Sequence, residues 1–105
     1  MNFKSIEFGS DDFRKECALR HQVLRAPTGL NLYNEELASE KCQRHFGLFD
    51  EAQHLVACAI AVLLSPAEAQ IRQMAVSVSY QRQGCGRQIL RGLENCLAES
   101  GHVRV

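Results

Sequence analysis

The sequence predicts an α+β fold, in which a mixed, mainly antiparallel sheet is flanked by helices, within one domain that spans residues 1–105. A continuous apolar run from Leu55 to Leu64 is typical of a central strand that is covered on both faces. The segments on either side of this run begin with the apolar and polar alternation of strands. Segments with helical periodicity lie before and after these strands, and the last of them is the clearest amphipathic helix of the chain.

The N-terminal segment predicts one strand and one helix. Apolar residues alternate imperfectly with polar ones over roughly residues 3 to 8, which indicates a first strand. Asp11 or Ser10 then caps a helix. This helix is expected to end by Arg25, because Ala26 precedes Pro27 and the residue before a proline disfavours the helical conformation. Its expected apolar face consists of Phe13, Cys17 and Leu24, with Ala18 and His21 beside them.

The middle of the chain predicts a short helix and a hairpin. Glu35 to Cys42 is rich in helix-forming residues, and Asn34 is its expected cap. Gln43 to Asp50 alternates, which indicates a second strand. Asp50 to Gln53 is expected to form the hairpin turn that leads into the apolar run.

The last third predicts a strand, a turn and a helix. Glu68 to Val76 begins with alternation and ends continuously apolar, as expected of a strand that enters the core. The helix follows Gly84 and Gly86, and its apolar residues recur on one face: Ile89, Leu90, Leu93 and Leu97. Val103 to Val105 is typical of the start of a further strand.

Composition excludes several functional classes. Twelve basic and twelve acidic residues give a net charge of +0, so no basic face for nucleic acid is predicted. The 5 cysteines contain no Cys-x-x-Cys pair, which argues against a disulfide framework and a structural zinc site. The apolar run is about half of the ~20 residues that span a bilayer, and the N-terminus lacks the apolar region of a signal peptide. We therefore expect a cytoplasmic protein with no metal and no membrane anchor.

The segment between the last strand and the last helix predicts an anion site. In Gln81-Arg82-Gln83-Gly84-Cys85-Gly86, two glycines separate an apolar strand from a helix expected to begin at the second glycine. Backbone N–H groups gather at such a helix N-terminus and favour a phosphate. Alternatively, the glycines only permit a tight turn with positive φ angles. A nucleotide P-loop and a dinucleotide fold fit less well, because Gly-Lys-Ser/Thr and a third glycine are absent.

This segment resembles the cofactor motif of the GNAT superfamily of acyl-CoA-dependent N-acyltransferases, Gln/Arg-x-x-Gly-x-Gly/Ala between an apolar strand and an amphipathic helix. Met74-Ala75-Val76 stands where that family places an apolar triplet beside the pantetheine arm, and Tyr80 stands just before the motif. The stretch from Arg20 to Leu30 also resembles the end of the first helix and the following loop in one group of bacterial GNAT proteins. The order of segments agrees as well, so the resemblance covers most of the chain. It implies acetyl transfer from acetyl-CoA to an amine on a small molecule or a peptide.

The resemblance also implies roles for individual residues. The Val76 backbone N–H is the implied donor to the oxyanion of the tetrahedral intermediate. Glu68 is a candidate general base, because the position associated with the base in one branch of the family falls on Gln70, which takes no proton; His45 is an alternative. Arg82 and Arg87 either add charge to the phosphates or are solvated surface residues, and Cys85 is interpreted as a small apolar residue between the glycines. The implied cofactor-binding residues are Met74, Ala75, Val76, Gln81, Arg82, Gln83, Gly84, Cys85, Gly86 and Arg87.

The resemblance stops at the C-terminus. A complete GNAT domain continues with a full fifth strand, another helix and two more strands, which include the tyrosine that protonates the leaving thiolate. The domain is therefore expected to be incomplete, either as a fragment or as a naturally short chain, and to bind CoA but transfer acyl groups poorly. The strand that ends at Val76 would keep an exposed edge, so we expect a homodimer through this edge. The alternatives are a non-catalytic CoA-binding or dimerisation module, and a structural domain whose glycine turn binds nothing.

Overall fold

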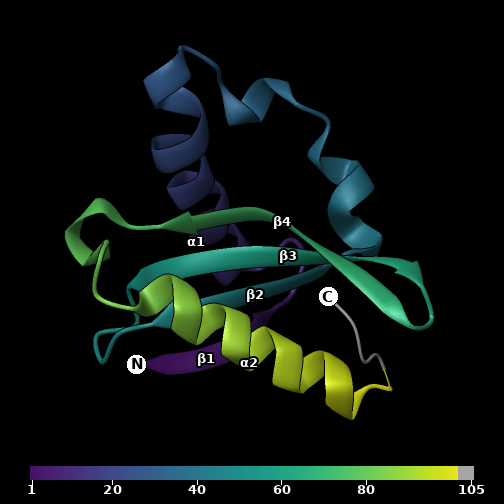
Figure 1. Cartoon of the computed structure of the whole chain (residues 1–105). Coiled ribbons are helices and arrows are strands. Elements are labelled where there is room, and N and C mark those ends of the chain that lie inside the picture. Colours follow the sequence, from purple (N-terminus) through teal and green to yellow (C-terminus); the bar gives the residue numbers. More distant parts are fainter. Residues whose placement is uncertain (102–105) are drawn as a thin grey trace.

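The computed structural model describes residues 1–101 and contains a 4-stranded antiparallel sheet in the order β1-β2-β3-β4. The strands are β1 (Asn2–Ile6), β2 (Arg44–Phe49), β3 (Leu55–Ser65) and β4 (Glu68–Val76). Helix α1 (Asp11–Arg20) covers one face of the sheet, and α2 (Cys85–Glu99) covers the other (Figure 1). The predicted α+β class and the predicted order of strands and main helices are confirmed.

The core lies on both faces of the sheet. On the α2 face, Phe46, Leu48 and Val56 pack against the buried stripe of that helix, formed by Cys85, Ile89, Leu93 and Leu97. On the α1 face, one cluster gathers around Phe13 and Phe49 and another around Leu19 and Cys58. Because residues 56–61 of β3 contribute to both faces, every one of them is buried, which explains this part of the apolar run. The prediction of a strand covered on both faces is wrong for the end of the run, where Leu63 and Leu64 are 46% and 61% exposed.

Helix α2 sits close to the sheet at Gly92. A Cβ atom at Gly92 would lie 2.6 Å from the Phe3 ring of β1, so only glycine lets the helix approach this far. The Phe3 ring in turn stacks on the buried Phe46 ring with a centroid distance of 5.6 Å. The helix-breaking tendency of glycine is therefore tolerated here for the sake of close packing.

Helix α1 begins as predicted, and it reaches the predicted limit at Arg25 only as a π-helical turn. The Ser10 hydroxyl accepts from the Phe13 N–H at 3.1 Å, which confirms one of the two expected caps. The α-helical part ends at Arg20, and a π-helical turn continues over His21–Arg25 before a 3-10 turn that contains Pro27. The predicted apolar face is partly wrong, because Ala18 is exposed while Glu16 and Arg20 are buried.

The short helix predicted over Glu35 to Cys42 is present only in part, as a 3-10 helix, and its predicted Asn34 cap is wrong. The structure has a 3-10 turn over Leu37–Cys42 that begins after Glu36, whose backbone is extended. Asn34 instead ends a separate 3-10 turn, Leu32–Asn34. So short a segment has few helical hydrogen bonds to offset the cost of nucleation, and tertiary contacts decide its shape.

The sheet has two edge strands in the part of the chain that the structure describes, β1 and β4, and the edge of β4 borders the predicted site. Strand β4 pairs with β3 on one side, and no strand of residues 1–101 pairs with its other side. The strand predicted to start at Val103 lies outside the described residues. None of the helices within residues 1–101 has the length and apolar character that crossing a membrane requires.

Candidate active site

Strand β4 carries a bulge in the middle of the candidate site. Between the pairs Cys58–Ala75 and Ile60–Arg72, β3 advances by two residues (58 to 60) and β4 by three (72 to 75). Gln73 has a φ of 54°, which is unusual for a residue other than glycine. A bulge of this kind changes which side chains share a face of the sheet.

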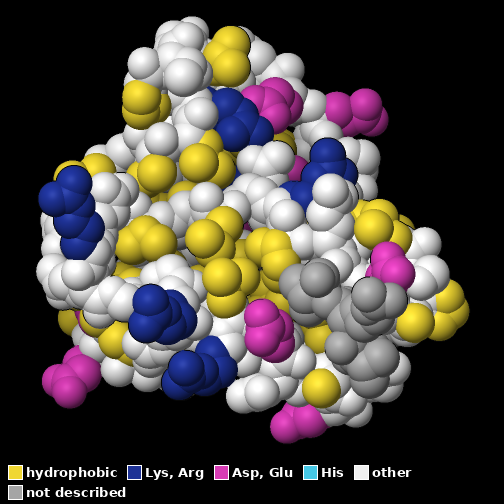
Figure 2. Space-filling model, viewed as in Figure 1, with side chains coloured by type: hydrophobic (Ala, Val, Ile, Leu, Met, Phe, Trp, Pro, Cys, Tyr) yellow, Lys and Arg dark blue, Asp and Glu magenta, His cyan; other side chains and the backbone are white. Residues whose placement is uncertain are grey.

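The bulge separates two surfaces of β4. Ile71 and Val76 pack on the core cluster of α2, and the Met74 and Val76 side chains lie 3.9 and 3.7 Å from the position of a Cβ at Gly86. These residues form an apolar strip along β4 that leads to the start of α2. Apolar side chains gather at the centre of this face of the molecule, where β4 runs beside α2 (Figure 2).

Beyond the strip, an exposed turn connects β4 to α2. Its backbone includes positive φ angles of 65° at Arg82 and 80° at Gly84. Gly84 is the N-cap, so α2 begins at Cys85 and not at the second glycine as predicted. The Gln81 side-chain amide donates to the Val76 carbonyl oxygen, and that of Gln83 donates to the Ser79 carbonyl oxygen, each at 3.1 Å. These bonds brace the turn on the strand.

The turn presents a series of unused backbone donors. Within the described residues, no N–H from Arg82 to Arg87 donates a hydrogen bond to another part of the chain, and the first that does is that of Gln88, to the Gly84 carbonyl oxygen at 3.0 Å. Unused N–H groups at a helix N-terminus, together with the helix dipole, favour an anion. The side chains of Arg82 and Arg87 are exposed beside these donors.

The open edge of β4 supplies one more donor near this turn. The Ser77 N–H donates to the Val56 carbonyl oxygen at 2.8 Å, so these two residues form a hydrogen-bonded pair of the antiparallel ladder. The next pair, Val76 with Ala57, is therefore of the non-hydrogen-bonded kind. The Val76 N–H consequently points away from β3, toward the open edge of the sheet.

The structure brings most of the predicted cofactor residues together. Met74 and Val76 lie beside Gly86 at the start of α2, and the turn Gln81–Gly84 lies between β4 and that helix. Ala75 belongs to this segment only through its backbone, because its side chain is buried with Leu19 and Cys58 on the α1 side. Cys85 is 4% exposed and packs in the α2 core, which agrees with its interpretation as a small apolar residue.

The two candidate bases lie away from Val76. Glu68 begins β4, eight residues earlier, which corresponds to about 26 Å along a strand. Its role stays a prediction, and this separation weighs against it. His45 is buried on the α1 side, and both of its ring nitrogens are engaged, Nδ1 with Glu16 and Nε2 with the Glu40 carbonyl oxygen, each at 2.9 Å. The alternative that His45 is the general base therefore finds no support.

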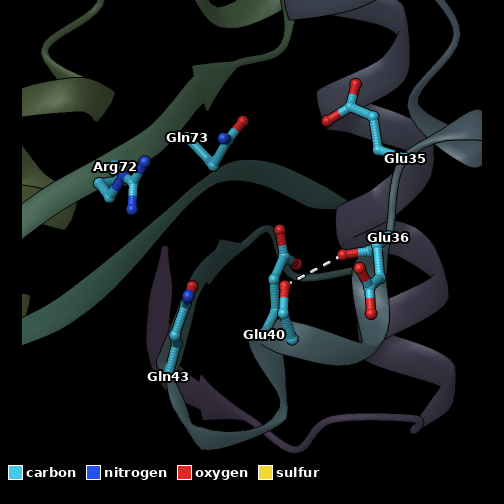
Figure 3. Close-up of a pocket in the computed structure, with 7 residues that line it drawn as sticks. Glu35, Glu36, Glu40, Gln43, Arg72 and Gln73 are labelled. Atoms are coloured by element: carbon cyan, nitrogen blue, oxygen red, sulfur yellow. Dashed lines mark hydrogen bonds between the residues drawn. The ribbon is translucent and has the colours of Figure 1, made fainter.

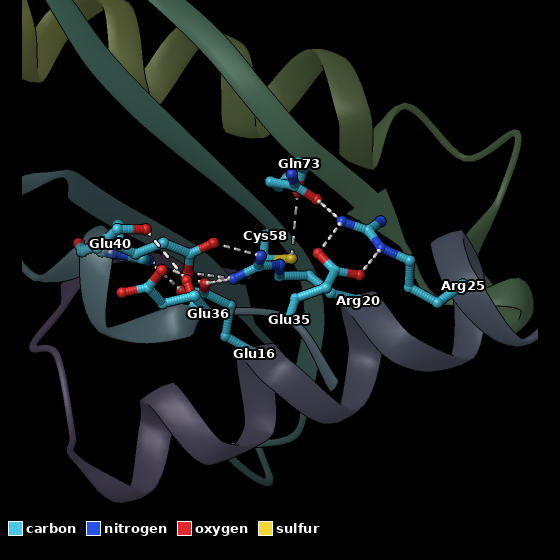
Figure 4. Close-up of polar contacts among 10 residues, drawn as sticks. Glu16, Arg20, Arg25, Glu35, Glu36, Glu40, Cys58 and Gln73 are labelled. Atoms are coloured by element: carbon cyan, nitrogen blue, oxygen red, sulfur yellow. Dashed lines mark hydrogen bonds and ion pairs between the residues drawn. The ribbon is translucent and has the colours of Figure 1, made fainter. Parts of the chain in front are cut away.

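His45 belongs to a buried ionic network that the sequence did not predict. Figure 4 shows three other members of this network, Glu16, Arg20 and Glu40. The Arg20 guanidinium donates to Glu16 at 3.0 Å and, through both terminal nitrogens, to Glu40 at 2.8 and 2.7 Å. Burial lowers the pKa of His45, but the hydrogen bond and charge of Glu16 outweigh burial, and the net effect raises the pKa of His45. Glu16, Glu40 and His45 have the donor types of a metal site, but the Arg20 guanidinium already supplies the cation there.

A polar pocket opens on the α1 side of the β4 bulge (Figure 3). It has a volume of about 240 Å³ and lies between β4 and the segment Glu35–Gln43. Its lining residues are Glu35, Glu36, Ser39, Glu40, Gln43, Arg72 and Gln73. The sequence reasoning missed this pocket. A signal for the bulge is present in the apolar series Ala69, Ile71, Met74 and Val76. Successive members of this series are two residues apart, as in a regular strand, except for Ile71 and Met74, which are three residues apart.

A sheet with helices on both faces, a bulged edge strand and a glycine turn at a helix N-terminus are the features that the resemblance to the N-acyltransferase fold implied. The sequence model of the acetyltransferase (GNAT) family matches residues 10–105. The chain therefore belongs to the GNAT acetyltransferase family, as the motif indicated. No curated protein sequence matches it.

Solved acetyltransferase structures share the fold at low sequence identity. An aminoglycoside 6'-N-acetyltransferase complexed with coenzyme A is 15% identical, with a TM-score of 0.78 over 97% of this chain and 58% of that one. The ribosomal-protein-S18-alanine N-acetyltransferase from Escherichia coli is 24% identical, with a TM-score of 0.69 over 95% and 61%. N-acetylglutamate synthase from Neisseria gonorrhoeae, complexed with coenzyme A and N-acetyl-glutamate, is 19% identical, with a TM-score of 0.70 over 97% and 24%. The chain thus spans less than two thirds of the length of these acetyltransferases.

Proposed function

We propose that the chain binds acetyl-CoA along β4 and the glycine turn and forms the cofactor-binding part of an N-acetyltransferase that acts on an amine. The observation that carries this proposal is the alignment of an apolar strip with a run of unused N–H donors. A ligand with an apolar arm and a pyrophosphate matches both at once. The coenzyme A named in two of the similar structures supports the choice of cofactor.

In this proposal the pantetheine arm lies beside Met74, Ala75 and Val76, and the pyrophosphate accepts from the N–H groups at Arg82 to Arg87. Gly86 lets the ligand approach closely between the start of α2 and β4. The arginines at 82 and 87 add positive charge to a site whose main donors are backbone groups.

The chemistry needs a nucleophile, an oxyanion donor and a proton route. The amine nitrogen attacks the thioester carbon, an N–C bond forms, the C–S bond breaks, and the amine loses one proton while the leaving thiolate gains one. In this proposal the outward Val76 N–H donates to the oxyanion, as the resemblance implied. Water is the proton acceptor in this proposal, since Glu68 and His45 both lie away from Val76.

Gly86→Ala tests the cofactor site directly. An added Cβ meets only ordinary contacts of 3.7 and 3.9 Å, at a helical position where Ala is favoured over Gly. Folding should therefore be unharmed while the space for the ligand shrinks. Isothermal titration with CoA should show affinity about tenfold weaker than wild type, equivalent to ~1.4 kcal/mol. Equal CoA affinity in the two proteins, or no CoA binding by the wild type, would contradict the proposal.

Ser10→Ala, on the far face, is a matched control for stability. It removes a helix cap and should lower the free energy of unfolding by ~1 kcal/mol without changing CoA affinity. Acetyl transfer is then measured separately, with acetyl-CoA and a panel of amines. CoA binding without any product would favour the alternative, a non-catalytic CoA-binding module.

We also propose that two copies associate through the open edge of β4. Exposed strand edges present unpaired backbone groups, and here the edge is flanked by exposed apolar side chains, Met74 at 40% and Val78 at 69%. Sedimentation equilibrium should give the mass of a dimer. Replacing Met74 by Lys should shift that equilibrium toward the monomer, and a wild type that is monomeric at all concentrations tested would exclude this mode of assembly.

A further inference from the structure

The polar pocket on the α1 side of β4 contains two kinds of charged residue. Two of its carboxylates are already neutralised by arginines: Glu40 by the buried Arg20, and Glu35 by Arg25, whose Nε donates to it at 2.6 Å. These ion pairs shape the wall of the pocket (Figure 4). Each of these two carboxylates therefore already has an arginine partner.

The remaining charged groups are Glu36 and Arg72. Within residues 1–101, neither side chain forms a hydrogen bond or an ion pair. Arg72 comes from β4 and Glu36 from the segment that faces it across the pocket (Figure 3). The pocket therefore offers one free cation and one free anion, and a ligand that satisfies both carries one charge of each sign.

The bulge is the reason that Gln73 lines this pocket together with Arg72. In a regular strand Arg72 and Gln73 would face opposite sides of the sheet, but both line the pocket. The Gln73 side-chain oxygen accepts from Arg25 at 2.8 Å, so the bulge is also tied to the pocket wall. Gln43 and Ser39 add neutral hydrogen-bonding groups around the charged pair.

We propose that this pocket binds the zwitterionic head of a diamino acid, with the ligand's carboxylate on Arg72 and its α-ammonium on Glu36. This inference rests on the proposed function, because it makes the ligand the acceptor of the acetyl group. The volume of about 240 Å³ is below the ~300–1,000 Å³ of pockets for drug-sized ligands, which fits a small metabolite.

The reacting nitrogen is the second, distal amine. An ammonium held by a carboxylate stays protonated and is a poor nucleophile. Three residues separate Gln73 from Val76, which is about 10 Å along a strand. A side-chain amine that extends from the head along β4 bridges much of this distance, so the ligand class is that of lysine and ornithine.

The test titrates the full chain, without cofactor, and follows backbone amide resonances by NMR. The probes are L-lysine and L-ornithine, with two analogues that each lack one charge: 1,5-diaminopentane has no carboxylate, and 6-aminohexanoate has no α-amine. At least one diamino acid should shift resonances of β4 and the segment Glu35–Gln43. Each analogue should bind at least about tenfold more weakly than lysine, because one charge-assisted contact is lost.

Two variants assign the contacts. Arg72→Gln removes the proposed partner of the ligand's carboxylate, so it should abolish the preference for lysine over 1,5-diaminopentane. Glu36→Gln removes the proposed partner of the α-ammonium, so it should abolish the preference for lysine over 6-aminohexanoate. Arg91→Gln and Glu94→Gln, on the exposed side of α2, are matched controls that should leave both preferences unchanged. Equal binding of all the probes, shifts confined to other regions, or no binding of either diamino acid would overturn the proposal.

The outcome is independent of the cofactor site. Failure of CoA to bind at the glycine turn would refute the proposed function even if lysine binds in the pocket. Conversely, CoA binding with an empty pocket would refute only this inference. Where product forms, mass spectrometry should place the acetyl group on the distal amine, and acetylation of the α-amine would overturn the assignment of the reacting nitrogen.

Discussion

Gly92→Ala should destabilise the protein even though alanine is the better helix former. Within a helix, Ala is favoured over Gly by about 1 kcal/mol. Against this gain, the new Cβ would lie 2.6, 2.7 and 2.9 Å from three atoms of the Phe3 ring. That ring stacks on the fully buried Phe46, so it cannot retreat into the core. Overpacking of this kind costs about 1–3 kcal/mol, which leaves a net loss of roughly 0–2 kcal/mol.

The assay is urea-induced unfolding followed by circular dichroism, in two backgrounds. In the wild type, Gly92→Ala should lower the free energy of unfolding by ~1 kcal/mol, the middle of this range. In a Phe3→Ala background the clash is gone, and the same substitution should raise the free energy of unfolding by ~1 kcal/mol. The sign should therefore reverse, with a coupling energy of about 1–3 kcal/mol. A stabilising effect in the wild type, or equal effects in both backgrounds, would refute the packing argument.

Three further predictions concern the α1 side of the molecule. Arg20→Met leaves the buried Glu16 and the half-buried Glu40 without the arginine that they share, so urea unfolding should show a loss of about 3–5 kcal/mol. Because the pKa of His45 is raised in the folded state, its contribution to stability is complete below the unfolded value of about 6.5. That contribution is lost as the pH rises through the higher pKa that His45 has in the folded protein. His45→Gln should therefore remove this part of the pH dependence of the free energy of unfolding. A thiol reagent followed by mass spectrometry should label the exposed Cys42 first, since burial raises the pKa of Cys17 to about 11; equal labelling of the two would contradict the structure.

The parts of the fold that the sequence predicted are those in which local pattern and tertiary environment agree. Residues 56–61 of β3 are all apolar because both faces of the strand are covered there, and α2 has a clean stripe because one face meets the sheet. The glycine turn was also readable, since its glycines and flanks are contiguous in sequence. In each case the residues that determine the local structure are close together in the sequence.

The buried network could not be predicted in this way. Glu16 and Arg20, spaced four residues apart, have the pattern of an ordinary exposed ion pair on a helix. Their burial depends on Glu40 and His45, which approach only once the sheet has formed and the 3-10 turn has folded back on α1. The bulge has a similar origin. A single residue is added to β4, and the alternation shifts by one position without any glycine or proline to mark it.

The two uses proposed for the open edge of β4 exclude each other at Val76. A second copy that pairs with this edge needs the outward N–H and C=O groups of the strand, and the Val76 N–H is the group proposed for the oxyanion. A ligand that binds only the monomer shifts the association equilibrium toward the monomer by mass action. Acetyl-CoA should therefore dissociate a dimer formed by strand pairing, and dimerisation should weaken the affinity for acetyl-CoA by the same factor. Sedimentation at several protein concentrations, with and without acetyl-CoA, measures both effects. A dimer that binds acetyl-CoA without any change in its dissociation constant would mean that the copies associate through another surface, and that the edge of β4 stays free for the reaction.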